Sequence, residues 1–220
     1  YPQYLAMYDS YEIFDGMTVN IERIDAIRYF YLHYFGGIYM DIDIMCLRRF
    51  PKWQKPTFGY LYKDYDGHKS AIANGFMATP ANHSLFLKII EQLPIAAVAH
   101  ENVMDTTGPA FLTRLIQQFG LSKVNVLEMP KIFPFQWNLK KKETKCSTVH
   151  ECRNEFPLSY TMDNYLQSWI PNWRLNFPLN SMGGQFECVG GSLLQITWML
   201  DKQSFATFNI EEDNYVNFVE

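Results

Sequence analysis

The sequence predicts an α/β protein in which a mixed central sheet is flanked by helices. The first supporting observation is the segment 20–46, which combines a helical pattern, a Gly-Gly turn and a short apolar strand. The second is that strand-like runs alternate with helix-like runs further along the chain. The third is the length of 220 residues without an internal repeat, which suits one substantial hydrophobic core.

The first predicted element is a helix that begins at Asn20 and ends before a Gly-Gly pair. At 3.6 residues per turn it has two stripes, and we expect one to be core and the other solvent. The first stripe consists of Ile21, Ile24, Ile27, Tyr31 and Tyr34, and the opposite stripe consists of Glu22, Ala26, Tyr29 and His33. Asp25 and Arg28 share a turn along the edge of the buried stripe, where a charged pair can line a cleft.

The second predicted element is a strand from Ile38 to Met45, reached through Gly36-Gly37, which suit a left-handed helix cap. In a strand, Asp41 and Asp43 point to the same face, roughly 7 Å apart. Two such carboxylates repel each other unless a cation lies near both. Mn²⁺ and Mg²⁺ prefer oxygen ligands and keep positions for the oxygens of a bound diphosphate. The local chemistry therefore indicates a metal and a phosphate.

The remaining elements follow from turn residues and apolar runs. Strands are expected at 58–62, 71–79 and 124–127, helices at 82–93 and 110–119, and an irregular aromatic segment at 131–136. Pro109 fits the first turn of the later helix. Asn82 is a candidate N-cap of the earlier one. Asn82-His83-Ser84 is also a glycosylation sequon, but the cap is the preferred interpretation.

Composition narrows the function classes. A net charge of −4 and a pI near 5.8 argue against a nucleic-acid partner. The five histidines show no metal-ligand spacing. Cys146 and Cys152 flank a polar insert and suit a disulfide if the domain lies in a secretory lumen, although four free thiols are also compatible with the sequence. Cys46 and Cys188 are expected to be buried thiols.

The run Arg23-Ile24-Asp25-Ala26-Ile27-Arg28, followed by Gly36-Gly37-Ile38-Tyr39-Met40-Asp41-Ile42-Asp43, resembles the signature of the DXD-containing sugar transferases. This family includes the initiating α-mannosyltransferases of yeast-type N-glycans, the inositol-phosphoceramide mannosyltransferases, and the animal α-galactosyl and α-N-acetylglucosaminyl transferases. A lone DxD is common by chance, whereas D-x-x-R, GG-I-Y and DxD at this spacing are specific. The resemblance continues at 74–78, 107–109, 133–134, 159–160 and 168–169.

The resemblance implies a GT-A type fold that transfers a hexose, with mannose favoured, and retains its anomeric configuration. The donor would be GDP-mannose or a UDP-sugar, and the acceptor a glycan or glycolipid. Residues 1–170 would form the catalytic domain, and 171–220 a C-terminal extension of unknown structure. In the family, the first strand and base-binding segment precede the part that Tyr1-Pro2-Gln3-Tyr4-Leu5 resembles. We therefore expect an N-terminally truncated domain that binds sugar nucleotides weakly.

The same resemblance implies roles for individual residues. The donor-binding residues would be Asp25, Arg28, Asp41, Asn74, Ser168 and Trp169. Asp25 and Arg28 would hold the donor sugar, and Asp41 would reach the ribose and a metal-bound water. Asn74 would border the sugar and acceptor space, while the pair at 168–169 would close over the diphosphate.

The implied cofactor is Mn²⁺, or Mg²⁺ in its place. Asp41 and Asp43 would be the catalytic metal-binding pair, with direct coordination by Asp43. Asp163 and Asn164 stand where the family usually has two histidines. They still offer oxygen ligands, and so they are further metal-ligand candidates.

Location and rival functions stay open at this point. A eukaryotic source implies the Golgi or another secretory lumen, with any membrane anchor in the full-length parent, and other sources imply the cytoplasm. A haloacid-dehalogenase-like phosphatase also places D-x-D after an apolar strand. That family has Thr or Val two residues past the second aspartate, where this sequence has Met45. A third hypothesis is a catalytically silent carbohydrate-binding subunit.

Overall fold

The computed structural model describes residues 17, 20–41, 43–62, 70–99, 102–134, 146, 148–163, 193–198 and 205–208. Its helices are α3 (Asn20–Phe35), α4 (Ser84–Ala99), α5 (Val103–Thr106), α6 (Pro109–Phe119), the 3-10 turn η1 (Leu121–Lys123), α7 (Met129–Ile132) and α9 (Val149–Glu155). Its strands are β1 (Gly37–Met40), β2 (Ile44–Cys46), β3 (Thr57–Tyr62), β4 (Ala71–Thr79), β5 (Asn125–Leu127), β6 (Thr161–Asp163), β7 (Leu193–Trp198) and β8 (Phe205–Phe208).

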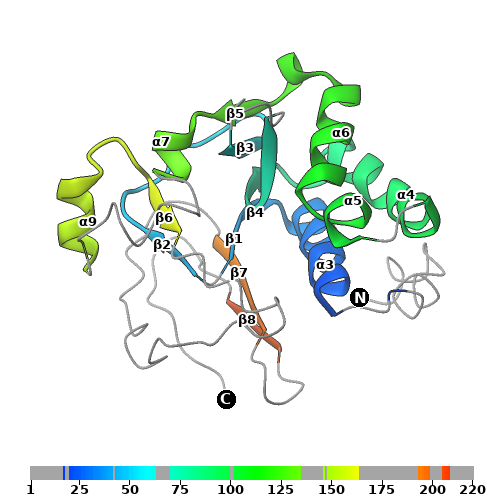
Figure 1. Ribbon diagram of the computed structural model, residues 1–220, viewed down its shortest axis with the longest axis horizontal. Helices are drawn as coiled ribbons and strands as arrows, with labels where there is room; N and C mark the ends of the chain where they lie inside the picture. The colour runs from blue at the N-terminus through cyan, green and yellow to red at the C-terminus, as the bar shows by residue number, and fades with distance from the viewer. Residues whose placement is uncertain are drawn as a thin grey trace.

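A mixed sheet in the order β5-β3-β4-β1-β7-β8 forms the centre of the described part of the protein (Figure 1). Strand β4 is antiparallel to β1 and β3, whereas β1 pairs with β7 and β3 pairs with β5 in parallel. Strands β2 and β6 form a separate antiparallel pair. The predicted α/β class with a mixed sheet and flanking helices is confirmed. Strands β7 and β8 lie within 171–220 and extend this sheet, and a domain boundary at residue 170 stays a prediction.

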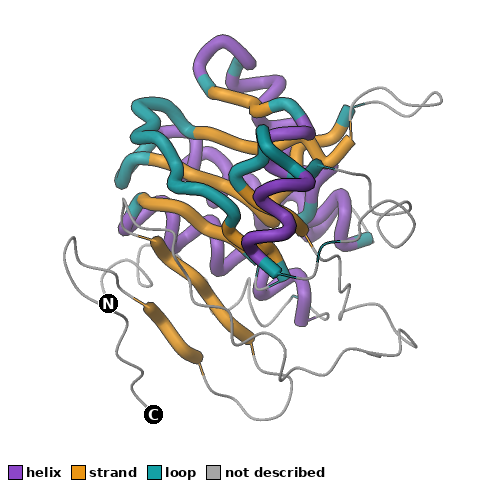
Figure 2. Tube along the Cα trace, turned by 90° about the vertical axis from the view of Figure 1, so that its left-hand side faces the viewer, coloured by secondary structure: helices purple, strands orange, loops and turns teal. Residues whose placement is uncertain are grey.

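Two hydrophobic clusters cover the two faces of the sheet. Neighbouring residues of one strand belong to different clusters: Tyr39 packs with α3, α4 and α6, whereas Met40 packs with β2, α7 and β6. This alternation is what a strand covered on both faces requires. All nine residues of β4 are buried for the same reason. Figure 1 shows α3 to α6 on one side and α7, α9, β2 and β6 on the other, and Figure 2 shows the strands running side by side.

Helix α3 is present as predicted, but its division into a core stripe and a solvent stripe is wrong. In the opposite stripe Glu22, Ala26 and Tyr29 are buried, and His33 is half-buried. The isoleucine stripe is only half-buried, and Tyr34 at its end is 46% exposed. Apolar residues occur all round this helix, so periodicity alone could not identify the face that packs on the sheet.

The Gly-Gly turn forms as predicted, but the strand after it is shorter than expected. Gly36 has a φ of 65°, and its N–H donates to the Leu32 carbonyl at 3.0 Å, which is a left-handed helix end. Strand β1 then ends at Met40 instead of continuing to Met45. The chain turns, and it resumes at Ile44 as β2 in the other sheet. Asp41 and Asp43 are therefore joined by a turn and do not share a strand face.

Most of the later elements match their predicted positions, because proline and glycine mark their ends. Strand β4 ends directly before Pro80, and α6 begins at Pro109. Within the predicted irregular segment, α7 ends at Ile132 and the part after it that the structure describes is irregular.

The start of α4 differs from the prediction. Asn82 has a φ of 56° and is not the N-cap. His83 fills this role instead: its Nδ1 accepts from the Leu85 N–H at 3.2 Å, and its carbonyl accepts from the Phe86 N–H at 3.0 Å. Burial lowers the pKa of His83, which favours the neutral ring that can accept. The helix continues through Pro94 to Ala99, beyond the predicted end.

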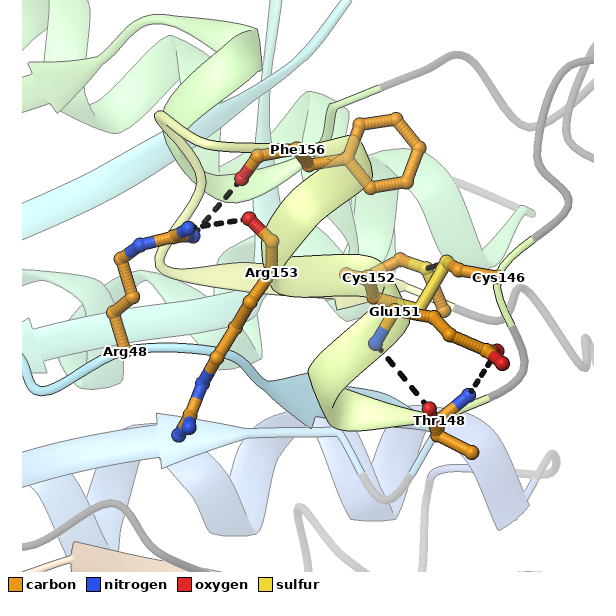
Figure 3. Close-up of a disulfide and its surroundings, with 8 residues drawn as sticks. Arg48, Cys146, Thr148, Glu151, Cys152, Arg153 and Phe156 are labelled. Atoms are coloured by element: carbon orange, nitrogen blue, oxygen red, sulfur yellow. Dashed lines mark hydrogen bonds between the residues drawn. A yellow bond between two sulfur atoms is a disulfide. The ribbon is translucent and has the colours of Figure 1, made fainter.

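Helix α9 and strand β6 form an arm that packs beside β2 (Figure 1). Cys146 forms a disulfide with Cys152, which lies in the middle of α9 (Figure 3), as one interpretation of the sequence proposed. Arg48 donates to the carbonyls of Arg153, Phe156 and Ser159 at 2.6, 2.9 and 2.6 Å. These links fix the arm against the segment that follows β2.

Cys46 and Cys188 were both expected to be buried thiols. Cys46 is half-buried and disulfide-bonded, so the expectation of a buried free thiol is wrong. Its sequence context, a short apolar strand, is equally typical of a free thiol, which explains the error. Cys188 lies outside the described residues. Within the described part of the chain, no helix has the length and apolar character to cross a membrane.

Candidate active site

Asp41 directly follows the last residue of β1, a strand inside the sheet. Its N–H donates to the Gly75 carbonyl at 2.9 Å, and its carbonyl accepts from the Ile44 N–H at 3.0 Å. The first bond continues the β1–β4 ladder by one residue, and the second closes the turn that contains Asp43. The DXD segment is therefore a tight turn held at the end of a central strand, where α/β proteins commonly bind ligands.

A buried guanidinium joins Asp41 to helix α3. Arg28 pairs with Asp25 at 2.9 Å and with Asp41 at 3.1 Å. It also donates to the Asn74 carbonyl at 2.9 Å and lies over the Tyr39 ring, 4.7 Å from its centroid. The side chains of Arg28 and Asp25 are 4% and 5% exposed, whereas that of Asp41 is 36% exposed. The predicted cleft-lining pair is thus buried behind Asp41, and Asp41 is the member at the surface.

Three further side chains complete the arrangement. The Tyr39 hydroxyl donates to Asp41 Oδ1 at 2.6 Å, and the Thr107 hydroxyl donates to Asp25 Oδ2 at 3.0 Å. The Asn74 side chain lies close enough to Asp25 to lower the pKa of its carboxyl. We call the six residues the buried charge cluster: Asp25, Arg28, Tyr39, Asp41, Asn74 and Thr107. Its members come from α3, β1, β4 and the turn before α6, so it exists only in the assembled fold.

The cluster holds two carboxylates and one guanidinium. Burial raises the pKa of Asp25 to about 7, although Arg28, the hydrogen bond from Thr107 and the nearby Asn74 side chain lower it. Burial also disfavours the charged form of Arg28, but Asp41 and Asp25 outweigh this and raise its pKa above the ordinary value. Burial raises the pKa of Tyr39, so its hydroxyl keeps the proton it donates. Arg28 is therefore the permanent charge of the cluster, and burial makes Asp25 take up its proton at a higher pH than an ordinary carboxyl.

Asp25→Asn is expected to change how the stability of the protein depends on pH. A carboxyl whose pKa is higher in the folded than in the unfolded protein stabilises fully below its ordinary pKa near 3.8. This contribution is lost as the pH rises toward 7. Relative to wild type, Asp25→Asn should therefore gain roughly a few kcal/mol of unfolding free energy between pH 4 and pH 7. Urea unfolding of both proteins across this range, without metal or nucleotide, measures the difference.

The control for this experiment is Glu91→Gln, which removes an exposed carboxylate on α4. It should give a curve parallel to that of wild type. Parallel curves for Asp25→Asn and wild type would show that Asp25 does not titrate in this window.

Gly75 leaves room for Asp41. A Cβ at Gly75 would lie 2.5 Å from Asp41 Oδ2, far inside van der Waals contact. Oδ1 of the same carboxylate is already bound by Tyr39 and Arg28. Both oxygens are therefore positioned by the protein, and the absence of a side chain at Gly75 is part of that positioning.

Gly75→Ala is expected to displace the Asp41 carboxylate and to weaken nucleotide-sugar binding about tenfold, with little loss of stability. The clash is with the end of one side chain, and Gly75 does not need a positive φ, so the fold can absorb the change. Calorimetric binding and thermal unfolding of the variant measure the two effects. Ala73→Ser, which adds one atom two residues away on β4, is the control. Unchanged binding by Gly75→Ala would mean that the position of Asp41 does not matter.

The residues of the DXD turn suit a divalent ion that also binds a phosphate. Among the described residues, no three His, Cys, Asp or Glu side chains are grouped closely enough to hold a metal alone. Mg²⁺ sites for nucleotides commonly use one or two carboxylates and complete the shell with phosphate oxygens and water. Tyr39 and Arg28 engage Asp41. Direct coordination of a metal by Asp43 stays a prediction.

Strand pairing brings a third predicted ligand toward this turn. In the β2–β6 ladder Ile44 is the register partner of Asp163, which places Asp163 opposite the residue that follows Asp43. Asn164, Ser168 and Trp169 lie outside the described residues. The roles of all these residues stay predictions.

Sequence reasoning gave no role to three residues of this site, Tyr39, Gly75 and Thr107. A signal for Tyr39 was available, because strand alternation places it on the same side as Asp41. Thr107 is 82 residues from Asp25, and nothing local indicates that they meet. The structure places Thr107 in the turn before α6, where its hydroxyl donates to Asp25.

Similarity to known proteins covers part of the chain. Residues 1–58 match the family described as "Glycosyltransferase sugar-binding region containing DXD motif". The chain is 35% identical to inositol phosphoceramide mannosyltransferase 3 of Schizosaccharomyces pombe over 123 residues, which cover 51% of this chain and 30% of that protein. It is 36% identical to mannosyl phosphorylinositol ceramide synthase CSH1 of Saccharomyces cerevisiae over 124 residues, which cover 54% and 30%. The chain thus spans about 30% of the length of these curated relatives.

Among solved structures, PaToxG glycosyltransferase aligns with a TM-score of 0.46 at 21% identity, covering 56% of this chain and 45% of that one. The sequence matches confirm the family resemblance predicted above, and the match to the DXD-containing sugar-binding region falls on residues 1–58.

Proposed function

We propose that the protein is a glycosyltransferase that moves mannose from a nucleotide-diphosphate sugar to a glycolipid of the inositol-phosphoceramide type, with retention and with a divalent cation. One observation carries this proposal. The DXD motif of the matched region is fixed by the buried charge cluster at the end of a central strand, and the curated relatives are named for mannose transfer to such lipids.

In this proposal Asp43, with Asp41 beside it, would hold Mn²⁺ or Mg²⁺. When bound, the ion would neutralise the charge that builds on the diphosphate as the donor bond breaks. The buried Nε of Arg28 has no hydrogen-bond partner among the residues that the structure describes. Because its side chain lies behind Asp41, Arg28 would act by fixing Asp41 and partly neutralising its charge. Asp25 and Asn74 hold Arg28 in place, and Asn74 borders the sugar.

The state of the carboxylates argues against a covalent sugar intermediate. Asp25 is buried and bonded to Arg28 and Thr107, so it is poorly placed to attack an anomeric carbon. Asp41 is bonded to Tyr39 and Arg28. We therefore infer a front-face transfer, in which a phosphate oxygen of the donor takes the proton of the acceptor hydroxyl while the new bond forms on the same face.

The bonds to Asp41 also weigh against the phosphatase alternative. A haloacid-dehalogenase-like enzyme uses the first aspartate as a nucleophile. Here one oxygen of Asp41 accepts a hydrogen bond from Tyr39 and pairs with Arg28, and the other faces Gly75. Such a carboxylate is held and partly neutralised, which lowers its nucleophilicity.

The test is a donor panel with the full-length natural protein, inositol phosphoceramide and Mn²⁺, read by mass spectrometry of the lipid. We expect transfer from GDP-mannose, loss of transfer with EDTA, and an α-linked product by NMR. Transfer from a UDP-sugar instead would favour the galactosyl or N-acetylglucosaminyl alternative. Hydrolysis of phosphomonoesters would support the phosphatase, and no reaction with any donor would support a silent subunit. A secretory-lumen location, Golgi if the source is eukaryotic, accompanies this proposal.

A further inference from the structure

The turn between β4 and α4 carries the tripeptide Asn82-His83-Ser84, the one Asn-x-Ser/Thr sequence without an intervening proline in the 220 residues. Such a tripeptide has two ordinary explanations, a helix cap or an acceptor for N-linked sugar. The structure removes the first, because His83 caps α4 and Asn82 adopts a left-handed conformation ahead of it. We propose that Asn82 is a site of N-linked glycosylation.

The geometry of the turn leaves the acceptor nitrogen accessible. Asn82 and Ser84 are both exposed. The Asn82 backbone N–H donates to the His33 carbonyl at 2.6 Å, whereas its side-chain amide has no hydrogen bond to any residue that the structure describes. The backbone is thus fixed while the side chain faces solvent. Asparagine tolerates the φ of 56° better than most residues do, so the conformation itself needs no capping role.

A glycan at this turn would not cover the candidate active site. In the β1–β4 ladder, Thr79 pairs with Gly37 and Phe76 pairs with Met40. Asn82 follows the Gly37 end of the ladder, whereas Asp41 follows the Met40 end. At about 3.3 Å per residue the two ends are roughly 10 Å apart along the strand, and the sugar would extend away from Asp41.

The cysteines indicate a compartment in which this modification occurs. Cys146 pairs with Cys152, and Cys46 is disulfide-bonded as well. Stable disulfides are typical of the secretory pathway and of extracellular proteins, where N-linked sugars are added. The co-reactant is a lipid-linked oligosaccharide diphosphate. Nδ2 of Asn82 forms a bond to the anomeric carbon, the bond from that carbon to the phosphate oxygen breaks, the lipid diphosphate leaves, and one amide proton is lost.

The test uses the natural full-length protein isolated from its own cells. Tryptic peptide 70–88 contains two asparagines, Asn74 and Asn82. Glycan removal by an amidase in ¹⁸O-water should convert Asn82, and not Asn74, to an aspartate that carries ¹⁸O. Fragment ions of the peptide locate the label.

Variants expressed in the same cells sharpen the result. Asn82→Gln and Ser84→Ala should each lose the glycosidase-sensitive mobility shift, and Ser84→Thr should keep it. Nucleotide-sugar binding by Asn82→Gln should equal that of wild type, because the residue lies outside the buried charge cluster. An unlabelled Asn82 in the isolated protein, or a shift that persists in Asn82→Gln, would overturn the proposal. Neither result depends on whether the protein transfers mannose.

Discussion

Asp43→Asn is expected to lower sugar transfer by roughly 100-fold or more, since catalytic groups that stabilise developing charge contribute effects of this size. The substitution keeps the size and shape of the side chain and removes the negative charge of the proposed direct metal ligand. Asp43 belongs to the turn that the Ile44–Asp41 bond closes, and asparagine suits turns, so the turn itself should persist. Initial transfer rates at saturating donor and increasing Mn²⁺ measure the loss.

The matched control is Glu91→Gln, which also removes one carboxylate charge but from the exposed face of α4. Its rate should equal that of wild type. If Asp43→Asn kept full activity at low Mn²⁺, the assignment of Asp43 as a metal ligand would have to be withdrawn. If only high Mn²⁺ restored activity, the assignment would stand and the effect would lie in metal affinity.

Arg28→Met should lower the unfolding free energy by roughly 3–5 kcal/mol and abolish donor binding, because removing one partner leaves buried charge uncompensated. Asp25 would then lie with a second carboxylate, Asp41, and without the guanidinium that now separates them. Methionine fills most of the space of the arginine stem, so a simple cavity contributes little to this loss. Urea unfolding and calorimetry with the nucleotide sugar measure the two effects.

A double variant separates structure from function at this position. Asp25→Asn in the Arg28→Met background removes one of the unpaired charges and should recover part of the stability. Donor binding should stay absent, because the guanidinium is still missing. Arg28→Lys keeps a charge but loses the planar fork that reaches Asp25, Asp41 and the Asn74 carbonyl, and it should fall between wild type and Arg28→Met. Recovery of donor binding in the double variant would show that Arg28 has only a structural task.

The fold was predictable where single residues constrain the backbone. Gly36 needs a positive φ, Pro80 cannot continue β4, and Pro109 suits the first turn of α6. The prediction failed where packing decides. The burial of the Ala26 stripe depends on which face of α3 meets the sheet, and the end of β1 at Met40 depends on β2 joining another sheet.

The candidate site was predictable only in its local parts. Asp25 and Arg28 are three residues apart, and the spacing alone indicated that they share a turn. The ion pair between Arg28 and Asp41 could not be predicted, because it depends on β4. The Asn74 carbonyl of this strand accepts from Arg28, and Gly75 leaves room for Asp41. Thr107 follows α4 in the sequence, 82 residues after Asp25. The two residues meet only because the elements that carry them pack together in the folded protein.

The disulfide between Cys146 and Cys152 of α9 makes the stability of this arm depend on the redox conditions around the protein. Closing so short a loop stabilises by roughly 2 kcal/mol, and neither cysteine belongs to the central sheet. A reductant would loosen the arm that carries Asp163, and it would also open the disulfide of Cys46, three residues after Asp43. Thiol-free buffers, and host cells with an oxidising folding compartment, should therefore give preparations in which Asp43 and Asp163 keep their places.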